Sequence, residues 1–153
     1  MRARLVRSAV TFCMVLVVAF SLATGVSGAG ERSGSAPKLN VVLSEWVLKP
    51  AREFIAAGKT NFVFKNKGNE KHEVVIVRGD DAKDLPTKAD GSVDESKIKK
   101  SAQIGEVEGI KPGKTKSKVF NLKKGTYTLF CNIVDKEGDV HFHKGMHAII
   151  DAS

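Results

Sequence analysis

Short segments of alternating apolar and polar residues follow one another from residue 39 to the end of the chain, separated by turn-forming residues. Their β-branched and aromatic residues predict strands at 39–48, 60–65, 72–77, 104–110, 115–122, 125–133 and 145–152. Glycine, proline and asparagine mark the turns, as at Pro112-Gly113. We find no internal repeat and no amphipathic helix of usable length, so the pattern predicts an all-β domain, an antiparallel β-sandwich.

The stretch 79–102 departs from this pattern. It is polar, charged and rich in turn residues, with no sustained apolar period. We therefore predict a long surface excursion there, with one helical turn near 94–100.

The first 29 residues have the features of a secretory signal peptide. A basic start with three arginines precedes an apolar run at 8–23, which is short for a bilayer-spanning helix. Small residues follow, and cleavage after Ala29 fits a small-x-small site. We predict export to the periplasm or the extracellular space, a flexible leader at 30–38 and one domain at 39–153. The alternative is an uncleaved signal that tethers the domain to the membrane.

The chain is basic, with 25 Lys and Arg residues against 17 Asp and Glu residues and a formal net charge of +8. Three of the arginines belong to the predicted signal peptide, so the mature domain carries a more moderate excess. Such a balance can favour an acidic partner or a membrane surface, but we predict no nucleic-acid partner from it. No nucleophile motif and no paired carboxylates stand out, so we do not expect an enzyme.

Potential metal-binding side chains are crowded into 131–150. This segment holds Cys131, Met146 and three of the four histidines of the chain. Cys13 would leave with the signal peptide, so Cys131 would be a single thiol without a disulfide partner in its own chain. Thiolate, imidazole and thioether are soft to borderline ligands that select copper, whereas thioether is a poor zinc ligand. A trigonal site with two imidazoles needs a histidine from elsewhere, and His72 is available.

Four segments match one family when taken together: KGNEKHEVVIV, EGIKPGKTKS, KKGTYTLFCNIV and HFHKGMHA. They resemble the cupredoxins, specifically the small plastocyanin-like bacterial members, and the resemblance extends over residues 39–152. It implies a Greek-key β-sandwich or barrel, one type 1 (blue) copper ion per chain and electron transfer. Carried over position by position, it implies a copper site made of His72, Cys131, His141 and Met146.

The loop that carries the second histidine departs from the family pattern. Nine residues separate Cys131 from His141, more than in many relatives, so DKEGDV resembles an insertion. His141 keeps the family's gap to Met146, but His143 lies two residues further on and stays an alternative ligand. If copper binds, an exposed edge of His141 would be the electron exit. Phe130, Phe142 and Ile133 are candidates for the apolar wall of the site, and we favour Phe142 because Phe130 faces opposite Cys131 in a regular strand.

The sequence thus predicts an exported, monomeric copper protein that carries one electron at a time. Its partner would be a redox protein of unknown identity, soluble or membrane-associated. Two alternatives remain. A copper homeostasis protein would use the same four ligands and exchange the metal, and a binding module with the same fold would hold no metal. The presence of every ligand type argues against the metal-free module.

Overall fold

The computed structural model of the chain describes residues 35–79 and 81–153. The predicted signal peptide and most of the predicted leader therefore lie outside the described residues. Within the described part, no helix has the length and the apolar character that a membrane crossing requires.

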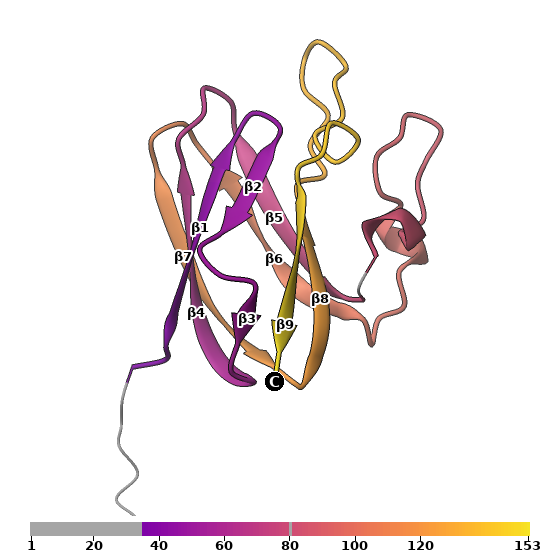
Figure 1. Cartoon of the computed structure of the whole chain (residues 1–153). Coiled ribbons are helices and arrows are strands. Elements are labelled where there is room, and N and C mark those ends of the chain that lie inside the picture. Colours follow the sequence, from indigo (N-terminus) through magenta and orange to yellow (C-terminus); the bar gives the residue numbers. More distant parts are fainter. Residues whose placement is uncertain (1–34, 80) are drawn as a thin grey trace, which may run out of the picture. The chain divides into compact units, whose positions relative to one another are not determined.

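Nine strands of the described residues build two sheets that lie face to face (Figure 1). The first sheet has the order β2-β1-β4-β7 and the second the order β3-β9-β8-β5-β6. The strands are β1 (Lys38–Ser44), β2 (Val47–Pro50), β3 (Phe54–Ile55), β4 (Gly58–Asn66), β5 (His72–Arg78), β6 (Gln103–Ile110), β7 (Thr115–Leu122), β8 (Gly125–Phe130) and β9 (His147–Ala152). Two 3-10 turns, η1 (Ala82–Asp84) and η2 (Glu95–Lys97), lie between β5 and β6.

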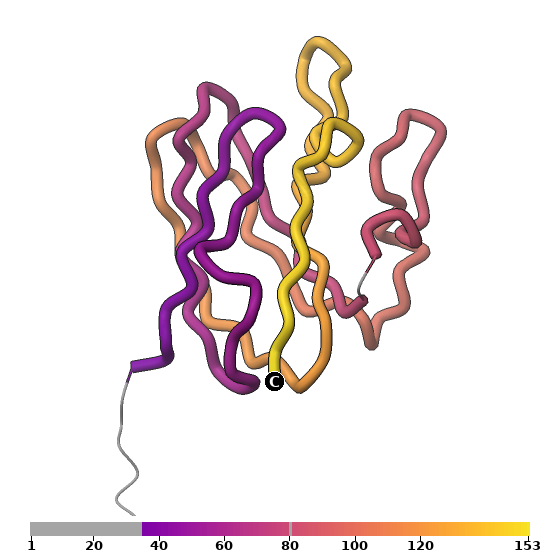
Figure 2. Tube along the Cα trace, viewed as in Figure 1, coloured from indigo at the N-terminus to yellow at the C-terminus, as the bar shows by residue number. Residues whose placement is uncertain are grey.

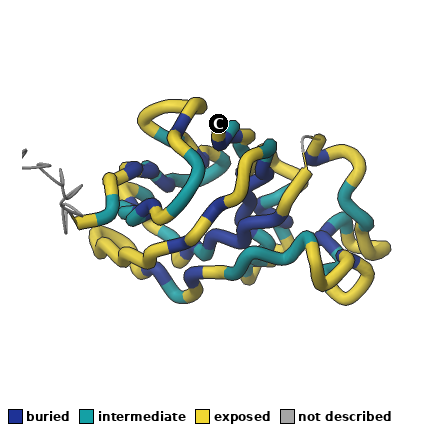
Figure 3. Tube along the Cα trace, turned by 90° about the horizontal axis from the view of Figure 1, so that it is seen from below, coloured by how far each residue is buried: buried dark blue, intermediate teal, exposed yellow. Residues whose placement is uncertain are grey.

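The interior between the sheets is formed by alternate residues of the strands, as the sequence pattern predicts. In β4, the side chains of Thr60, Phe62, Phe64 and Asn66 are buried, and the residues between them are partly exposed. Figure 3 shows many of the buried residues toward the middle of the domain, with exposed residues mainly in the outer loops. Apolar residues of both sheets form one cluster, which includes Cys131. The thiol therefore belongs to the main core.

The strand β5 is buried on both faces. Val74 and Ile76 belong to the main core, whereas Val75 and Val77 pack with part of the stretch 79–102 in a second cluster. This covering explains the continuous apolar run of β5, because a strand buried on both faces needs apolar residues at every position. The predicted helical turn corresponds to η2, and η1 is a further turn that the sequence did not predict.

The predicted all-β sandwich is confirmed, but two strand pairs are parallel. β1 pairs with β4 and β3 pairs with β9 in the parallel sense. The prediction of one strand at 39–48 is wrong, because a two-residue turn at Glu45-Trp46 divides it into the hairpin of β1 and β2. β3 then lies in the opposite sheet, and β4 returns beside β1 in the same direction.

Among the loops at one end of the sandwich, three lie around the predicted metal ligands (Figures 1 and 2). They are the β1–β2 turn at 45–46, the β4–β5 loop at 67–71 and the loop at 131–146, and we call them the loop end. The carboxyl terminus lies at the opposite end. Every predicted metal ligand lies within the loop end or next to it.

Candidate metal centre

Two of the predicted ligands lie on neighbouring strands. His72 is the first residue of β5, and Cys131 follows Phe130, the last residue of β8. These strands pair directly, with Val75 opposite Phe130. The Sγ of Cys131 accepts a hydrogen bond from the backbone N–H of Glu73 at 3.5 Å. The register of the sheet therefore fixes the thiol beside the first histidine.

Backbone hydrogen bonds fold the loop 131–146 back on Cys131. The N–H of Cys131 donates to the carbonyl of Met146, and the N–H of Met146 donates to the carbonyl of His141, each at 3.0 Å. The N–H of His141 donates to the carbonyl of Ile133 at 2.9 Å. These bonds bring His141 and Met146 to Cys131 although nine or more residues lie between them.

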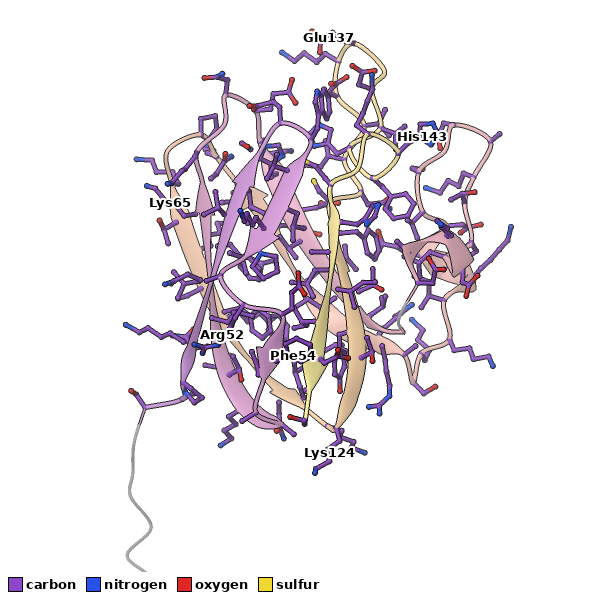
Figure 4. All side chains as sticks on the ribbon, viewed as in Figure 1. Arg52, Phe54, Lys65, Lys124, Glu137 and His143 are labelled. Carbon is purple, nitrogen blue, oxygen red and sulfur yellow. The ribbon has the colours of Figure 1, made fainter. Side chains whose placement is uncertain are left out.

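The predicted insertion forms a small hairpin of its own. Val134 and Val140 form an isolated antiparallel bridge that closes it. Near its tip Gly138 has a φ of 88°, a conformation that glycine adopts readily. Figure 4 shows Glu137 at the far end of this hairpin. Because the two ends of the hairpin lie side by side, the extra residues leave His141 in place.

Three donor atoms converge: the Sγ of Cys131 and the Nδ1 atoms of His72 and His141. The two Nδ1 atoms are 3.2 Å apart, and the Sγ lies 4.0 Å from the Nδ1 of His72 and 3.4 Å from that of His141. A point equidistant from all three would lie about 2.1 Å from each, close to the bond lengths of about 2.0–2.3 Å that imidazole and thiolate make to zinc. The triangle therefore has the right size for one metal ion.

The three donor side chains and Met146 are fully buried. Met146 packs in the same apolar cluster as Cys131, and its backbone carbonyl accepts a hydrogen bond from the N–H of Cys131. The structure thus brings all four predicted residues together. A site with this donor set suits a soft or borderline metal ion and excludes solvent from it.

The alternative histidine, His143, lies elsewhere. Its side chain is exposed, and it lines a shallow hollow with His147 and with residues 82–87. Figure 4 shows His143 on the side of the loop that faces the excursion. The structure therefore brings His141, and not His143, to Cys131.

The expectation of an exposed His141 edge is wrong, because neighbouring side chains cover the ring. Trp46 contacts it edge-on, with ring centroids 5.4 Å apart. Trp46 is itself half-buried, and the ammonium of Lys144 lies 5.4 Å from the centroid of its ring. The φ of Trp46 is 63°, which is rare for a residue other than glycine and fits the second central position of a tight two-residue turn.

The expectation that Phe142 belongs to the wall of the site is also wrong. Phe142 packs against Phe130, with ring centroids 5.6 Å apart, in the second cluster beyond the five-stranded sheet. Ile133, another candidate, does pack against the cluster that contains Cys131. Phe142 lies on the opposite side because it packs on Phe130, which the alternation along β8 directs away from the face that Cys131 occupies.

Sequence reasoning missed two carboxylates behind the imidazoles. An oxygen of Glu45 lies 3.8 Å from the Nε2 of His72, and an oxygen of Glu70 lies 3.1 Å from the Nε2 of His141. Burial raises the pKa of Glu45, but backbone N–H donors outweigh it and hold this pKa below its usual value. Glu45 is far from His72 in the sequence, and no motif there points to it as a neighbour of the site. Glu70 could have been noticed, because it lies two residues before His72.

Burial keeps the strand-borne donors in their neutral forms when no cation is bound. It raises the pKa of the Cys131 thiol to about 11. It also lowers the pKa of His72 to about 4, with repulsion from His141 adding to the shift. A metal ion must therefore displace the thiol proton, while His72 offers a free nitrogen lone pair at neutral pH.

No protein-family model and no curated protein sequence matches the chain. Solved structures do match it. The reduced auracyanin of the photosynthetic bacterium Roseiflexus castenholzii is 18% identical with a TM-score of 0.57, and the match covers 78% of this chain and 99% of that chain.

Two further structures give the same result. Auracyanin A, a "blue" copper protein of the green thermophilic photosynthetic bacterium Chloroflexus aurantiacus, is 16% identical with a TM-score of 0.52, covering 78% of this chain and all of that one (100%). The azurin Az-iso2 of the methylotroph Methylomonas sp. strain J is 20% identical with a TM-score of 0.52, and the match covers 78% of this chain and 99% of that chain. These similarities show that the described domain has the cupredoxin fold.

Proposed function

We propose that the protein binds one copper ion through His72, Cys131, His141 and Met146 and carries single electrons. The observation that carries this proposal is the buried triangle of one sulfur and two Nδ1 atoms. The fold supports it, because auracyanin A is a "blue" copper protein of the same fold.

Copper bound there would supply a one-electron couple between Cu(I) and Cu(II). The Cys131 thiol would give up its proton and bind as thiolate, since the thiolate is the form that ligates metals. His72 is neutral at pH 7, so it can bind copper through its Nδ1 without first losing an imidazolium proton. Met146 would add a fourth, weaker donor through its thioether.

The protein holds its donors in one arrangement for both redox states. The paired strands position His72 and Cys131, and three backbone hydrogen bonds position the loop that carries His141. Because the donors are buried, water does not rearrange around the site when the charge changes. Low reorganisation of this kind favours fast electron exchange. Trp46 touches the ring of His141 and is partly exposed, so it joins the site to the surface.

Complete burial favours an electron carrier over a protein that hands copper on. Copper transfer requires an incoming ligand to reach the ion, and none of the four side chains has exposed surface. A carrier instead needs the ion to stay bound while electrons pass.

We extend the proposal to location and partner. The predicted signal peptide supports export, to the periplasm or the extracellular space. A redox protein, soluble or membrane-associated, would dock at the loop end, where Trp46 reaches the surface. All four donors come from one chain, so a monomer suffices for the site.

Voltammetry of the copper-loaded protein tests the carrier role, with copper analysis after repeated cycles and a Cu(I) chelator present. We expect one reversible one-electron wave and a copper content that stays at one ion per chain. Loss of copper to the chelator on reduction would contradict the carrier role and favour copper homeostasis.

A further inference from the structure

Three buried polar atoms behind the donor triangle make no hydrogen bond within the described residues. They are the Nε2 of His72, the Nε2 of His141 and the Oε2 of Glu70. Buried polar atoms are nearly always paired, so three together require an explanation. The Nε2 of His141 lies 3.1 Å from the Oε2 of Glu70, and the Nε2 of His72 lies 3.8 Å from the Oε1 of Glu45. Each imidazole thus faces its own carboxylate.

Hydrogen bonds and close packing fix the carboxylate of Glu45 and the backbone of Glu70. Glu45, in the β1–β2 turn, accepts the backbone N–H groups of Asn69 and Glu70 at 2.6 and 2.8 Å. Gly68 lies against the same carboxylate, where an added Cβ would collide with Glu45. From the other side, the side-chain amide of Asn66 donates to the carbonyl of Glu70 at 2.6 Å. The β4–β5 loop therefore fixes the backbone of Glu70, from which its carboxylate reaches the ring of His141.

We propose that Glu45 and Glu70 are positioning residues for the two imidazole ligands, an inference that rests on the proposed copper site. Glu70 lies within reach of the Nε2–H of His141 and can accept it, which selects the His141 tautomer whose Nδ1 is free to bind metal. Glu45 lies 3.8 Å from the Nε2 of His72, too far for a hydrogen bond, and stabilises the Nε2–H of copper-bound His72 through its charge. The carboxylate also strengthens the imidazole as a donor, and its negative charge favours Cu(II) over Cu(I). The effect of Glu70 exceeds that of Glu45, because its pair is the closer one.

A second cation is the alternative role for Glu70. Ligand atoms of Glu70, Asp135 and His141 lie within 4.8 Å of one another, and the three residues line one surface hollow. His141 would then have to bind metals through both ring nitrogens and lose both ring protons. A neutral imidazole that binds copper through Nδ1 and donates its Nε2–H to Glu70 keeps one ring proton, and this smaller loss of protons favours the positioning role.

The tautomers can be measured directly. Long-range proton–nitrogen NMR of the metal-free and the Cu(I)-loaded wild-type protein, both diamagnetic, distinguishes Nδ1–H from Nε2–H. We expect the Nε2–H tautomer for His141 in both forms and for His72 in the Cu(I) form, because in the metal-free protein the Nδ1–H of His72 can donate to the Nδ1 of His141, 3.2 Å away. An Nδ1–H tautomer at His141 in the metal-free protein would overturn the inference, whether or not any variant folds.

Variants separate the charge from the hydrogen bond. Glu70→Gln keeps an acceptor oxygen without the charge, Glu70→Ala removes both, and Glu108→Gln removes the same charge from an exposed position on β6. We expect Glu70→Ala to bind Cu(II) about 10- to 100-fold more weakly. Each tenfold loss confined to Cu(II) raises the reduction potential by about 59 mV. The rise should be smaller in Glu70→Gln, smaller again in Glu45→Gln and absent in Glu108→Gln.

The outcomes distinguish this inference from the copper site on which it rests. If all proteins are blue and Glu70→Gln has the potential of Glu108→Gln, the inference fails and the copper site stands. If the wild type never turns blue, the copper site fails, and the NMR experiment still decides the tautomers. Uptake of one further Zn²⁺ by the copper-loaded wild type, lost in Asp135→Asn, would assign Glu70 to a second metal site and overturn the positioning role.

Discussion

The four proposed ligands are held by two different kinds of structure. His72 and Cys131 stand at the ends of paired strands, where the β-ladder determines their separation. His141 and Met146 stand in a loop, which is held by a few backbone hydrogen bonds and contains a closed hairpin. Many backbone hydrogen bonds of the β-ladder hold the strand ends in position, whereas only a few hold the loop. The strand pair is therefore the constant half of the site, and the loop pair is the half that substitutions can shift.

Removal of the loop histidine has the largest expected effect. His141→Ala removes one of three converging donors and should abolish the intense colour of the copper-loaded protein. His143→Ala is the matched control, because His143 is exposed and only two residues away, and its spectrum should be nearly unchanged. Colour that survives in His141→Ala and disappears in His143→Ala would mean that the ligand register of the loop is shifted by two residues.

Burial of the strand-borne His72 should make the metal-free protein sensitive to acid. Its pKa is about 4 in the folded protein against 6.5 ordinarily, so between these values the unfolded chain binds more protons. The free energy of unfolding should therefore fall as the pH decreases from 6.5 toward 4, by up to about 3 kcal/mol from this group. Denaturant titrations at pH 7 and pH 4.5 measure the loss, with His72→Gln as control. If the free energy of unfolding falls by the same amount in the parent and in His72→Gln, His72 does not contribute to the acid sensitivity.

Substitution of the loop methionine should change the potential while the site survives. Leucine has a similar volume, so Met146→Leu should cost less than about 1.5 kcal/mol of stability and remain coloured. Its reduction potential should rise, because Cu(II) loses a donor, and Met146→Gln should lower the potential, because an oxygen donor favours Cu(II). Voltammetry of both variants decides the point. Potentials equal to that of the parent in both would show that Met146 is not a ligand.

Shortening the hairpin in the loop should have the smallest effect. Replacement of residues 136–138 by Asn-Gly substitutes a two-residue turn for the tip of the hairpin. This turn can still join the two segments that meet at the Val134–Val140 bridge. Because this bridge lies between the tip and His141, the absorption spectrum and the potential should stay near those of the parent. A lost or strongly shifted band would show that the tip itself holds His141 in position.

The strand half of the site was accessible from the sequence. The residue pattern predicts that β5 begins at His72, although it extends the strand that carries Cys131 to residue 133, past the end of β8 at Phe130. The chemistry of His72 and Cys131 then marks them as candidate donors. The chemistry of His141 and Met146 was equally visible. The choice between His141 and His143 was not, because two residues of an extended segment point the same way and only the hairpin at 134–140 decides between them.

The surroundings of the imidazoles could not be predicted. Trp46 covers His141 because a turn interrupts what the apolar pattern presents as one strand. Glu45 reaches His72 only through the packing of that turn against the β4–β5 loop. Contacts of this kind join segments that are distant in the sequence and leave no periodic signal. The burial of His141 could not be predicted either, because the side chains that cover it come from such distant segments.

Titration of the metal-free protein with Cu(II), followed by visible absorption, tests the proposed copper site most directly. A blue or green thiolate-to-copper charge-transfer band should grow and saturate at one copper ion per chain. Cys131→Ser, which removes the thiolate but no disulfide, should fold and stay colourless. A wild-type protein that remains colourless, or a band that survives in Cys131→Ser, would contradict the account.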